Sequence, residues 1–208
     1  MTATVETAEQ SGVAPEARAM RADARRNRTK VLKAARASMA RDGLDAQMEE
    51  IAREAGVGVG TVYRHFPNKD ELVEALANER FERLSDLARE ALAESDPWRS
   101  FESFIRAGAR IQTEDRALSE VLVSRPDTMQ AAADRVGILG LVEKLMDRAQ
   151  SAGVIRPDAV PTDVPMLMCA LAGTNSNPKM DPERYIAIAL DGLRAPGSSP
   201  LPPPAEDR

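Results

Sequence analysis

The sequence predicts an all-α fold of about nine helices, in which a small N-terminal head precedes a larger C-terminal body. Apolar residues recur every three or four positions along most of the 208 residues, and no stretch alternates with a period of two. A proline follows a residue that can begin a helix at Asp96-Pro97, Arg125-Pro126 and Asp181-Pro182. The charge divides the chain as well, because residues 18–69 hold 12 Lys and Arg against 6 Asp and Glu, whereas the whole chain carries −5.

The composition is typical of a soluble cytoplasmic protein. Apolar residues make up 43% of the chain, which is enough for a hydrophobic core. Cys169 is the single cysteine, so no disulfide can form within the chain, as expected in a reducing cytosol. The sequence has neither an apolar run of about 18 residues nor an N-terminal signal segment. A basic head on an acidic body is typical of a protein that binds DNA.

The N-terminal segment changes from a polar tail to a basic helix. We expect residues 1–20 to be a disordered tail, because they lack a periodic apolar face. The first helix of the head is predicted over residues 27–42. The basic residues that lead into it are Arg25, Arg26 and Arg28. They belong either to a solvated basic helix or to an arm that contacts DNA phosphates or the minor groove.

Residues 47–66 are predicted to form two short helices joined by a tight turn, which is a helix-turn-helix. Gly56 and Gly58 permit the sharp turn. The apolar positions fall on one stripe of each helix, namely Met48, Ile51, Ala52 and Ala55 in the first and Val62 and Phe66 in the second. Glu49 and Glu50 would repel phosphate, so we expect their face to point away from DNA.

The run GVGVGTVYRHFPNKDEL, residues 56–72, closely resembles the signature of the TetR/AcrR family of bacterial transcriptional regulators. The resemblance covers about residues 25–84 and implies a three-helix DNA-binding head whose second helix-turn-helix helix enters the major groove. The residues that it assigns to DNA contact are Gln47, Gly60, Thr61, Tyr63, Arg64, His65 and Lys69. Gln47 stands where the family favours a threonine cap, and Arg64 can bind guanine or phosphate or pair with a nearby acid.

The body is predicted over residues 85–194. A helix capped by Asn68 runs unbroken to about Glu94 and joins the head to the body. A long helix is expected over residues 127–152. Residues 195–208 are rich in proline, serine and acidic residues, so we expect a second disordered tail.

The large apolar side chains of the body have two open interpretations. They either pack as plain core or, as the resemblance implies, line a cavity for a small effector. Methionine adapts to irregular ligands and the inward stripes carry few ionisable residues, so we expect a mainly apolar effector that is neutral or weakly polar. The candidate lining residues are Phe101, Phe104, Ile105, Ile138, Leu141, Leu145 and Met168.

The last two helices carry small residues along one stripe each, which permits close approach of another helix. The resemblance implies that these stripes meet those of a second chain in a homodimer, and the alternative is packing within one chain. The candidate interface residues are Met166, Ala170, Gly173, Ile186, Ala189 and Leu193.

Together these features imply a sequence-specific DNA-binding transcriptional regulator, a ligand-released repressor that acts as a homodimer on a palindromic operator. The alternative is a small-molecule-binding or protein-interaction protein with a vestigial DNA-binding head. An enzyme is not expected, because no His-Cys-Asp cluster, glycine-rich phosphate loop or metal-ligand spacing occurs. We therefore expect no catalytic residue, metal or cofactor. The expected partners are operator DNA, a small effector and a second copy of the chain, without a membrane.

Overall fold

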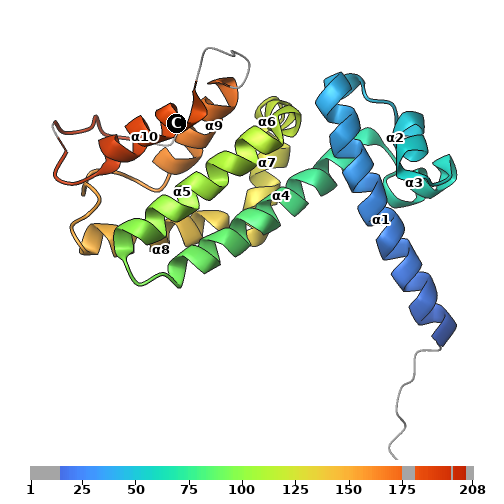
Figure 1. Ribbon diagram of the computed structural model, residues 1–208, viewed down its shortest axis with the longest axis horizontal. Coiled ribbons are helices and arrows are strands. Elements are labelled where there is room, and N and C mark those ends of the chain that lie inside the picture. Colours follow the sequence, from blue (N-terminus) through green and yellow to red (C-terminus); the bar gives the residue numbers. More distant parts are fainter. Residues whose placement is uncertain (1–14, 175–180, 198, 205–208) are drawn as a thin grey trace, which may run out of the picture.

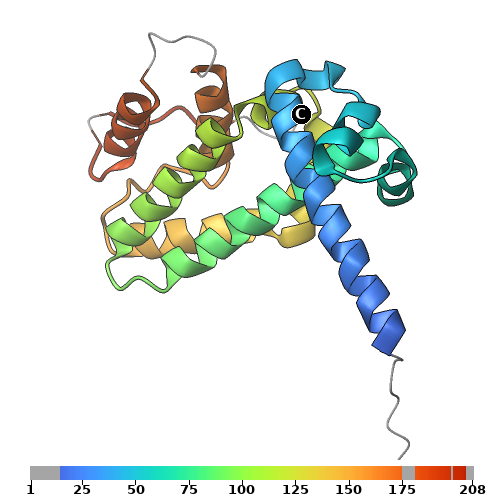
Figure 2. The same cartoon turned by 45° about the vertical axis from the view of Figure 1, so that its right-hand side comes forward.

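The computed structural model describes residues 15–174, 181–197 and 199–204, and this part of the chain is all-α, as predicted. Its ten α-helices, one more than the nine or so expected, are accompanied by one 3-10 helix, η1. The bounds are α1 (Pro15–Asp42), η1 (Gly43–Asp45), α2 (Met48–Ala55), α3 (Val59–His65), α4 (Lys69–Leu92), α5 (Pro97–Glu114), α6 (Arg116–Val123), α7 (Pro126–Val136), α8 (Ile138–Ser151), α9 (Asp163–Thr174) and α10 (Pro182–Leu193). Figures 1 and 2 show α1 to α3 at one end of the molecule and α5 to α10 at the other, with α4 running between them. None of the helices in the described part is both long and apolar enough to cross a membrane.

The first helix begins much earlier than predicted. α1 starts at Pro15, so residues 15–20, which were expected to belong to a disordered tail, form its first turns. The alanine, arginine and methionine in this segment are good helix formers, and their propensity prevails although the segment has no periodic apolar face. Figures 1 and 2 show the N-terminal half of α1 extending away from the rest of the molecule. Residues 1–14, 198 and 205–208, the remainder of the two predicted tails, lie outside the described residues.

The predicted helix-turn-helix is present as α2 and α3. Gly56 has a φ of 65°, in the left-handed region, and ends α2. The Gly56 and Val57 N–H groups donate to the carbonyls of Arg53 and Ala52, at 3.2 and 3.1 Å, which fixes the turn. The buried apolar residues of the two helices include Met48, Ile51, Ala52 and Val62, as the sequence pattern predicted.

α4 connects two hydrophobic cores. The head core contains Val31, Leu32, Ala35, Met39, Ile51, Val62, Phe66, Leu72, Leu76 and their buried neighbours. The body core contains Ala88, Ala91, Phe101, Phe104, Ile105, Val142, Leu145, Met146, Leu171, Ile186, Leu190 and their buried neighbours. Phe81, near the middle of α4, packs against both cores. The Asn68 side chain caps α4 by accepting the Glu71 N–H at 2.9 Å, as predicted.

α6 belongs to the body in sequence, directly after α5, but packs into the head core. Leu118, Val121 and Leu122 of α6 are 2–4% exposed, belong to the head core and are accompanied by Ala132 of α7. α6 contacts α1 and η1. Burying a side chain such as valine or leucine stabilises the fold by about 1.5–3 kcal/mol. The head therefore cannot shift against the body without disturbing α6.

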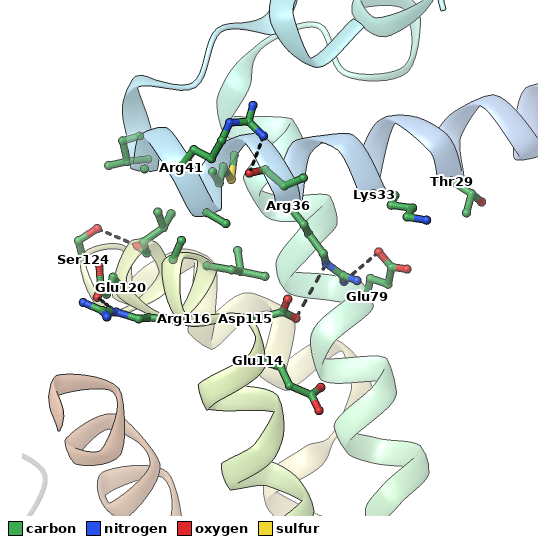
Figure 3. A pocket seen from close by; sticks show the side chains of 18 residues that line it. Thr29, Lys33, Arg36, Arg41, Glu79, Glu114, Asp115, Arg116, Glu120 and Ser124 are labelled. Carbon is green, nitrogen blue, oxygen red and sulfur yellow. Dashed lines mark hydrogen bonds and ion pairs between the residues drawn. The ribbon is translucent and has the colours of Figure 1, made fainter. Parts of the chain in front are cut away.

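Ion pairs cross the same head–body boundary. A hollow of about 950 Å³ lies between α1 and α6. Figure 3 shows Arg36 of α1 among the charged and apolar side chains that line it. The Arg36 guanidinium lies 3.1 Å from the Glu79 carboxylate of α4 and 4.0 Å from that of Asp115, the residue before α6. These side chains are 20–43% exposed, and exposed ion pairs contribute about 0–1 kcal/mol each. The apolar contact of α6 is therefore the stronger link.

The predicted long helix over residues 127–152 is two helices. Gly137 has a φ of 63° and separates α7 from α8, and its N–H group donates to the carbonyls at the end of α7. A single left-handed glycine is enough to end a helix in this way. The sequence pattern did not reveal the break at Gly137, because one apolar face continues along α8 through Ile138, Val142, Leu145 and Ala149.

We expect Gly137→Ala to lower the free energy of unfolding by about 1 kcal/mol, because an L side chain in the left-handed region is strained. No heavy atom lies within 4 Å of the Cβ position at either Gly137 or Gly140, so packing should not interfere. Gly140→Ala, inside α8, is the matched control and should raise the same free energy by about 0.5–1 kcal/mol. Urea unfolding at one protein concentration measures both, and equal changes would contradict this assignment.

The described part of the C-terminal segment, for which disorder was expected over residues 195–208, makes hydrogen bonds to the body at Ser199 and Leu201. Arg156 is 6% exposed and donates to both Asp158 oxygens, at 2.6 and 2.9 Å, and to the Ser199 carbonyl. Asp158 in turn accepts the Leu201 N–H at 2.8 Å. These hydrogen bonds from Arg156 and from the Leu201 backbone hold the pKa of Asp158 well below its usual range. The buried Arg156 and its exposed partner Asp158 therefore hold in place a segment whose composition alone is typical of disorder.

Candidate nucleic-acid interface and body cavity

α3 presents a polar face because Val62, at its centre, is completely buried in the head core. Gly60, Tyr63 and Arg64 are exposed on that face, and Tyr63 is 40% exposed. At Gly60 no heavy atom lies within 4 Å of the Cβ position, so the glycine leaves open space above the helix. Such a surface permits close approach of a DNA backbone.

Tyr63 is held by an acidic residue of the first helix. Its hydroxyl donates to the Glu49 carboxylate at 3.1 Å, and this hydrogen bond raises the pKa of Tyr63 above its ordinary value. Glu49 therefore lies beside the exposed face of α3, whereas we had expected Glu49 and Glu50 to point away from DNA. A helix-turn-helix brings the start of α2 next to α3, and the orientation of Glu49 and Glu50 relative to DNA stays a prediction.

The other predicted contact residues of the helix-turn-helix are engaged with their own backbone or are partly covered. The exposed Gln47 donates from Nε2 to the Asp45 carbonyl at 2.7 Å. The Lys69 ammonium, half-buried at the start of α4, donates to the Leu44 carbonyl. Thr61 and His65 are half-buried.

The predicted basic arm is part of a continuous helix. Arg25, Arg26 and Arg28 are exposed on α1, and Arg26 pairs with Asp23 one turn earlier. The Arg28 guanidinium lies 5.5 Å from the centroid of the Phe66 ring, which places it at the C-terminal end of α3. The three arginines can thus add positive charge beside the helix-turn-helix without a flexible arm.

Replacing Arg25, Arg26 and Arg28 together with alanine should weaken DNA binding and flatten its salt dependence. The slope of log K against log salt should fall by about 0.9 for every phosphate that the variant no longer neutralises. Fluorescence anisotropy of labelled duplex DNA at several salt concentrations measures the slope. The matched control replaces Arg83, Arg89 and Arg99, exposed on α4 and α5, and removes the same charge. Equal slopes for the two triple variants would show that the arginines of α1 stay off the DNA.

The body contains a mainly apolar cavity of about 240 Å³, bounded by α4 to α9. The predicted lining residues that border it are Phe104, Ile105, Ile138 and Met168. Phe101, Leu141 and Leu145 do not border it. Phe101 and Leu145 are buried in the body core, and Leu141 is half-buried against it. For these three residues the interpretation as plain core is the better one.

The cavity also has polar walls that sequence reasoning missed. Arg80 of α4 is 6% exposed, and its Nη1 donates to the Ser119 hydroxyl at 2.8 Å. Burial lowers the pKa of Arg80 to about 10, while the nearby Asp115 charge raises it. Gln112 of α5 is a third polar residue of the wall.

The position of Arg80 in the sequence could have indicated its burial. It follows Leu76 by four residues and Val73 by seven, and both are completely buried on α4. The helical repeat therefore places Arg80 on the buried stripe of α4. A charged residue on such a stripe is uncommon and often functional.

The predicted interface residues divide into two groups. Met166 is 63% exposed and Ala170 is exposed on α9, so they are free to meet another chain. Ile186 and Leu193 of α10 are buried in the body core, so their packing is within the chain, and Ala189 is half-buried. The predicted apolar stripe of α10 therefore packs mainly within its own chain. Gly173 lies in α9, but its surroundings fall outside the described part of the structure.

Two family models match the two parts of this molecule. Residues 31–76 match the bacterial regulatory proteins of the tetR family, and residues 96–195 match the C-terminal domain of SbtR-like transcriptional regulators. The first match contains the helix-turn-helix, and the second contains most of the cavity wall.

A similar relative is the HTH-type transcriptional repressor KstR of Mycolicibacterium smegmatis, 33% identical over 135 residues. The match covers 62% of this chain and 65% of that protein, so this chain spans a little under two thirds of its length. The fatty acid degradation regulator FadR of Bacillus halodurans, 22% identical with a TM-score of 0.64, shares the fold.

Two solved structures match over nearly their whole length. The TetR transcriptional regulator SCO0520 of Streptomyces coelicolor is 35% identical with a TM-score of 0.60, and the match covers 80% of this chain and 98% of that one. The TetR transcription regulatory protein of Mycobacterium vanbaalenii is 38% identical with a TM-score of 0.62, covering 84% of this chain and 99% of that one. The helix-turn-helix, the helical body and these similarities identify the chain as a DNA-binding transcriptional regulator of the TetR family.

Proposed function

We propose that this protein is a ligand-released repressor, which binds a near-palindromic operator as a homodimer and leaves it when a small effector enters the body cavity. One observation carries the proposal: α6 borders the cavity and also belongs to the head core. Leu122 does both, because it lines the cavity and is 3% exposed within the head core.

The release mechanism follows from this double role of α6. A ligand that presses against Leu122 or Ser119 would displace α6, and α6 would carry α1 with it. The ion pairs of Arg36 with Glu79 and Asp115 would be rearranged at the same boundary (Figure 3). In a dimer, tilting each head would change the distance between the two recognition helices, which must fit successive major grooves. The ligand can shift this equilibrium only by its differential affinity for the two states.

The alternative, a binding protein with a vestigial head, is less well supported. A head that no longer bound DNA would not need to keep the open position at Gly60 or the exposed Tyr63 and Arg64 on a helix of seven residues. The repressor name of the similar KstR protein also favours the proposed direction of regulation.

Duplex DNA flanking the protein's own gene should be retarded in a gel shift, and Arg64→Ala should weaken this binding. The loss of one long forked donor should cost about 1–3 kcal/mol, roughly 5- to 150-fold in affinity. Arg89→Ala, on the body part of α4, is the control and should bind like the wild type. If no flanking DNA were retarded, the head would be vestigial, and if Arg64→Ala bound as tightly as the control, Arg64 would not be a DNA contact.

The exposed faces of α9 and α10 are the proposed dimer surface. Met166 and Ala170 on α9 and Ile188 on α10, which is 62% exposed, present apolar groups to solvent. α9 and α10 contact each other, so these residues can contribute to one surface. Exposed apolar groups concentrated on two neighbouring helices favour a contact with a second copy.

Ala170→Arg should produce folded monomers that bind the operator weakly, because a charged side chain would lie against apolar groups of the second copy. Ala131→Arg on α7, which is also exposed, is the matched control and should leave the assembly unchanged. Sedimentation velocity gives the mass of each variant, and circular dichroism shows whether it is folded. A normal dimer of Ala170→Arg would place the interface elsewhere.

A further inference from the structure

We propose that the body cavity binds a small amphiphilic carboxylate, whose carboxylate pairs with the Arg80 guanidinium and whose short apolar chain lies against the cavity wall. This proposal rests on the proposed function for its regulatory meaning, but the binding itself can be measured without DNA. It replaces the neutral or weakly polar effector that the apolar sequence pattern favoured.

Arg80 places a positive charge in a nearly water-free wall. The side chain is 6% exposed, and its pKa of about 10 keeps it charged at neutral pH. In the part of the chain that the structure describes, no carboxylate oxygen lies within 4.0 Å of its nitrogens. The acid whose charge raises the pKa of Arg80 is Asp115, and Asp115 already faces Arg36 at 4.0 Å. A buried charge without a close counter-charge is unfavourable, so an incoming anion would gain by supplying one.

The Arg80 guanidinium also has N–H groups that can donate hydrogen bonds to a ligand. It carries five N–H groups, and within the described residues its side chain donates only to Ser119. The Ser119 oxygen lies 3.1 Å from the Gln112 carbonyl and 3.0 Å from the Asp115 carbonyl, so its own proton points to these acceptors. Ser119 thereby receives Arg80 and holds it in place. The planar fork of an arginine matches a carboxylate with two parallel hydrogen bonds.

The shape and charge of the cavity select the rest of the ligand. Phe104, Ile105 and Met168 provide apolar walls beside Arg80. A volume of about 240 Å³ corresponds to roughly eight water-sized groups, which suits a chain of about six to eight carbons. A phosphate, with a charge of about −1.5 to −2, would exceed the single charge of Arg80, so a carboxylate is the better match.

Gly108 keeps room for such a chain. It borders the cavity on α5, and a Cβ at this position would lie 3.6 Å from the Met168 sulfur and 3.7 Å from Leu84 Cδ2. A larger side chain would therefore occupy space that the ligand needs.

One acidic residue borders the cavity and must be considered. Asp134 of α7 is exposed and accepts a hydrogen bond from Gln130 at 2.8 Å. Water screens its charge, and it lies more than 4.0 Å from the Arg80 nitrogens. It therefore neither neutralises Arg80 nor keeps an anion out.

Isothermal titration calorimetry on the full-length wild-type protein tests the proposal with three probes. Octanoate carries the charge and the chain, 1-octanol the chain alone, and acetate the charge alone. We expect octanoate to bind at least about tenfold more tightly than 1-octanol or acetate. A hydrogen bond to a charged partner lowers the Kd by about this factor. Equal or tighter binding of 1-octanol, or no binding of octanoate, would overturn the proposal. Octyl phosphate, titrated as a fourth probe, would overturn it by binding more tightly than octanoate.

Two variants then assign the preference to Arg80. Arg80→Met should remove the preference for octanoate over 1-octanol, whereas Arg80→Lys, which keeps the charge, should retain part of it. If Arg80→Met does not fold, Gly108→Leu is the second variant and should weaken the binding of both octanoate and 1-octanol. The comparison of the probes on the wild-type protein then remains the decisive test. An unchanged octanoate preference in folded Arg80→Met would also overturn the assignment.

A gel shift with octanoate separates this proposal from the proposed function. Release of the operator by octanoate would support both. Octanoate that binds in calorimetry without releasing DNA would leave the carboxylate site intact and contradict ligand release. Release by 1-octanol alone, with no calorimetric binding of octanoate, would support ligand release and refute the carboxylate site.

Discussion

The apolar contact between α6 and the head is the constraint on which the rest of the structure depends. Leu118, Val121 and Leu122 are almost completely buried among head residues, although they follow α5 of the body in sequence. Three such burials contribute several kcal/mol, whereas each partly exposed ion pair of Arg36 contributes about 1 kcal/mol or less. The position of the head is therefore set mainly by α6, and α6 is also a wall of the cavity. A change of shape in the cavity can therefore act on the head through this short helix.

A series of polar contacts near α6 joins the wall of the cavity to the boundary between the head and the body. Arg80 donates to Ser119, whose hydroxyl lies 3.0 Å from the Asp115 carbonyl, and the Asp115 carboxylate faces Arg36 of α1. Glu79, which pairs with Arg36, is the neighbour of Arg80 in α4. A ligand that attracted the Arg80 guanidinium would thus act on the same few bonds that join the body to α1. Hydrogen bonds of this kind are specific in direction. They can therefore act together with the less directional contact between the ligand and α6.

Local chemistry explains which features could be predicted from the sequence. The Asn68 cap, the left-handed Gly56 and the buried Val62 follow from short-range rules, and all three are present. The break at Gly137 escaped prediction because a glycine is tolerated inside a helix and the apolar face continues past it. The docking of the C-terminal segment depends on Arg156 and Asp158, about forty residues earlier, and composition does not encode such a contact. The burial of Arg80 could have been predicted from the helical repeat of α4, but its partner Ser119 lies on another helix and could not.

The small size of the cavity limits how a ligand can act. About eight to ten nonhydrogen atoms, at roughly 0.3–1.5 kcal/mol each, supply about 2–15 kcal/mol of binding free energy. Reversing a two-state population from 1:99 to 99:1 needs a difference of about 5.5 kcal/mol between the affinities for the two states. Apolar contacts with Phe104 or Met168 change little when helices shift slightly, so they contribute to binding in both states. A pair between a carboxylate and Arg80 depends steeply on distance and on the exclusion of water, and it can differ between the states far more. A ligand of this size would therefore exert its control chiefly through Arg80.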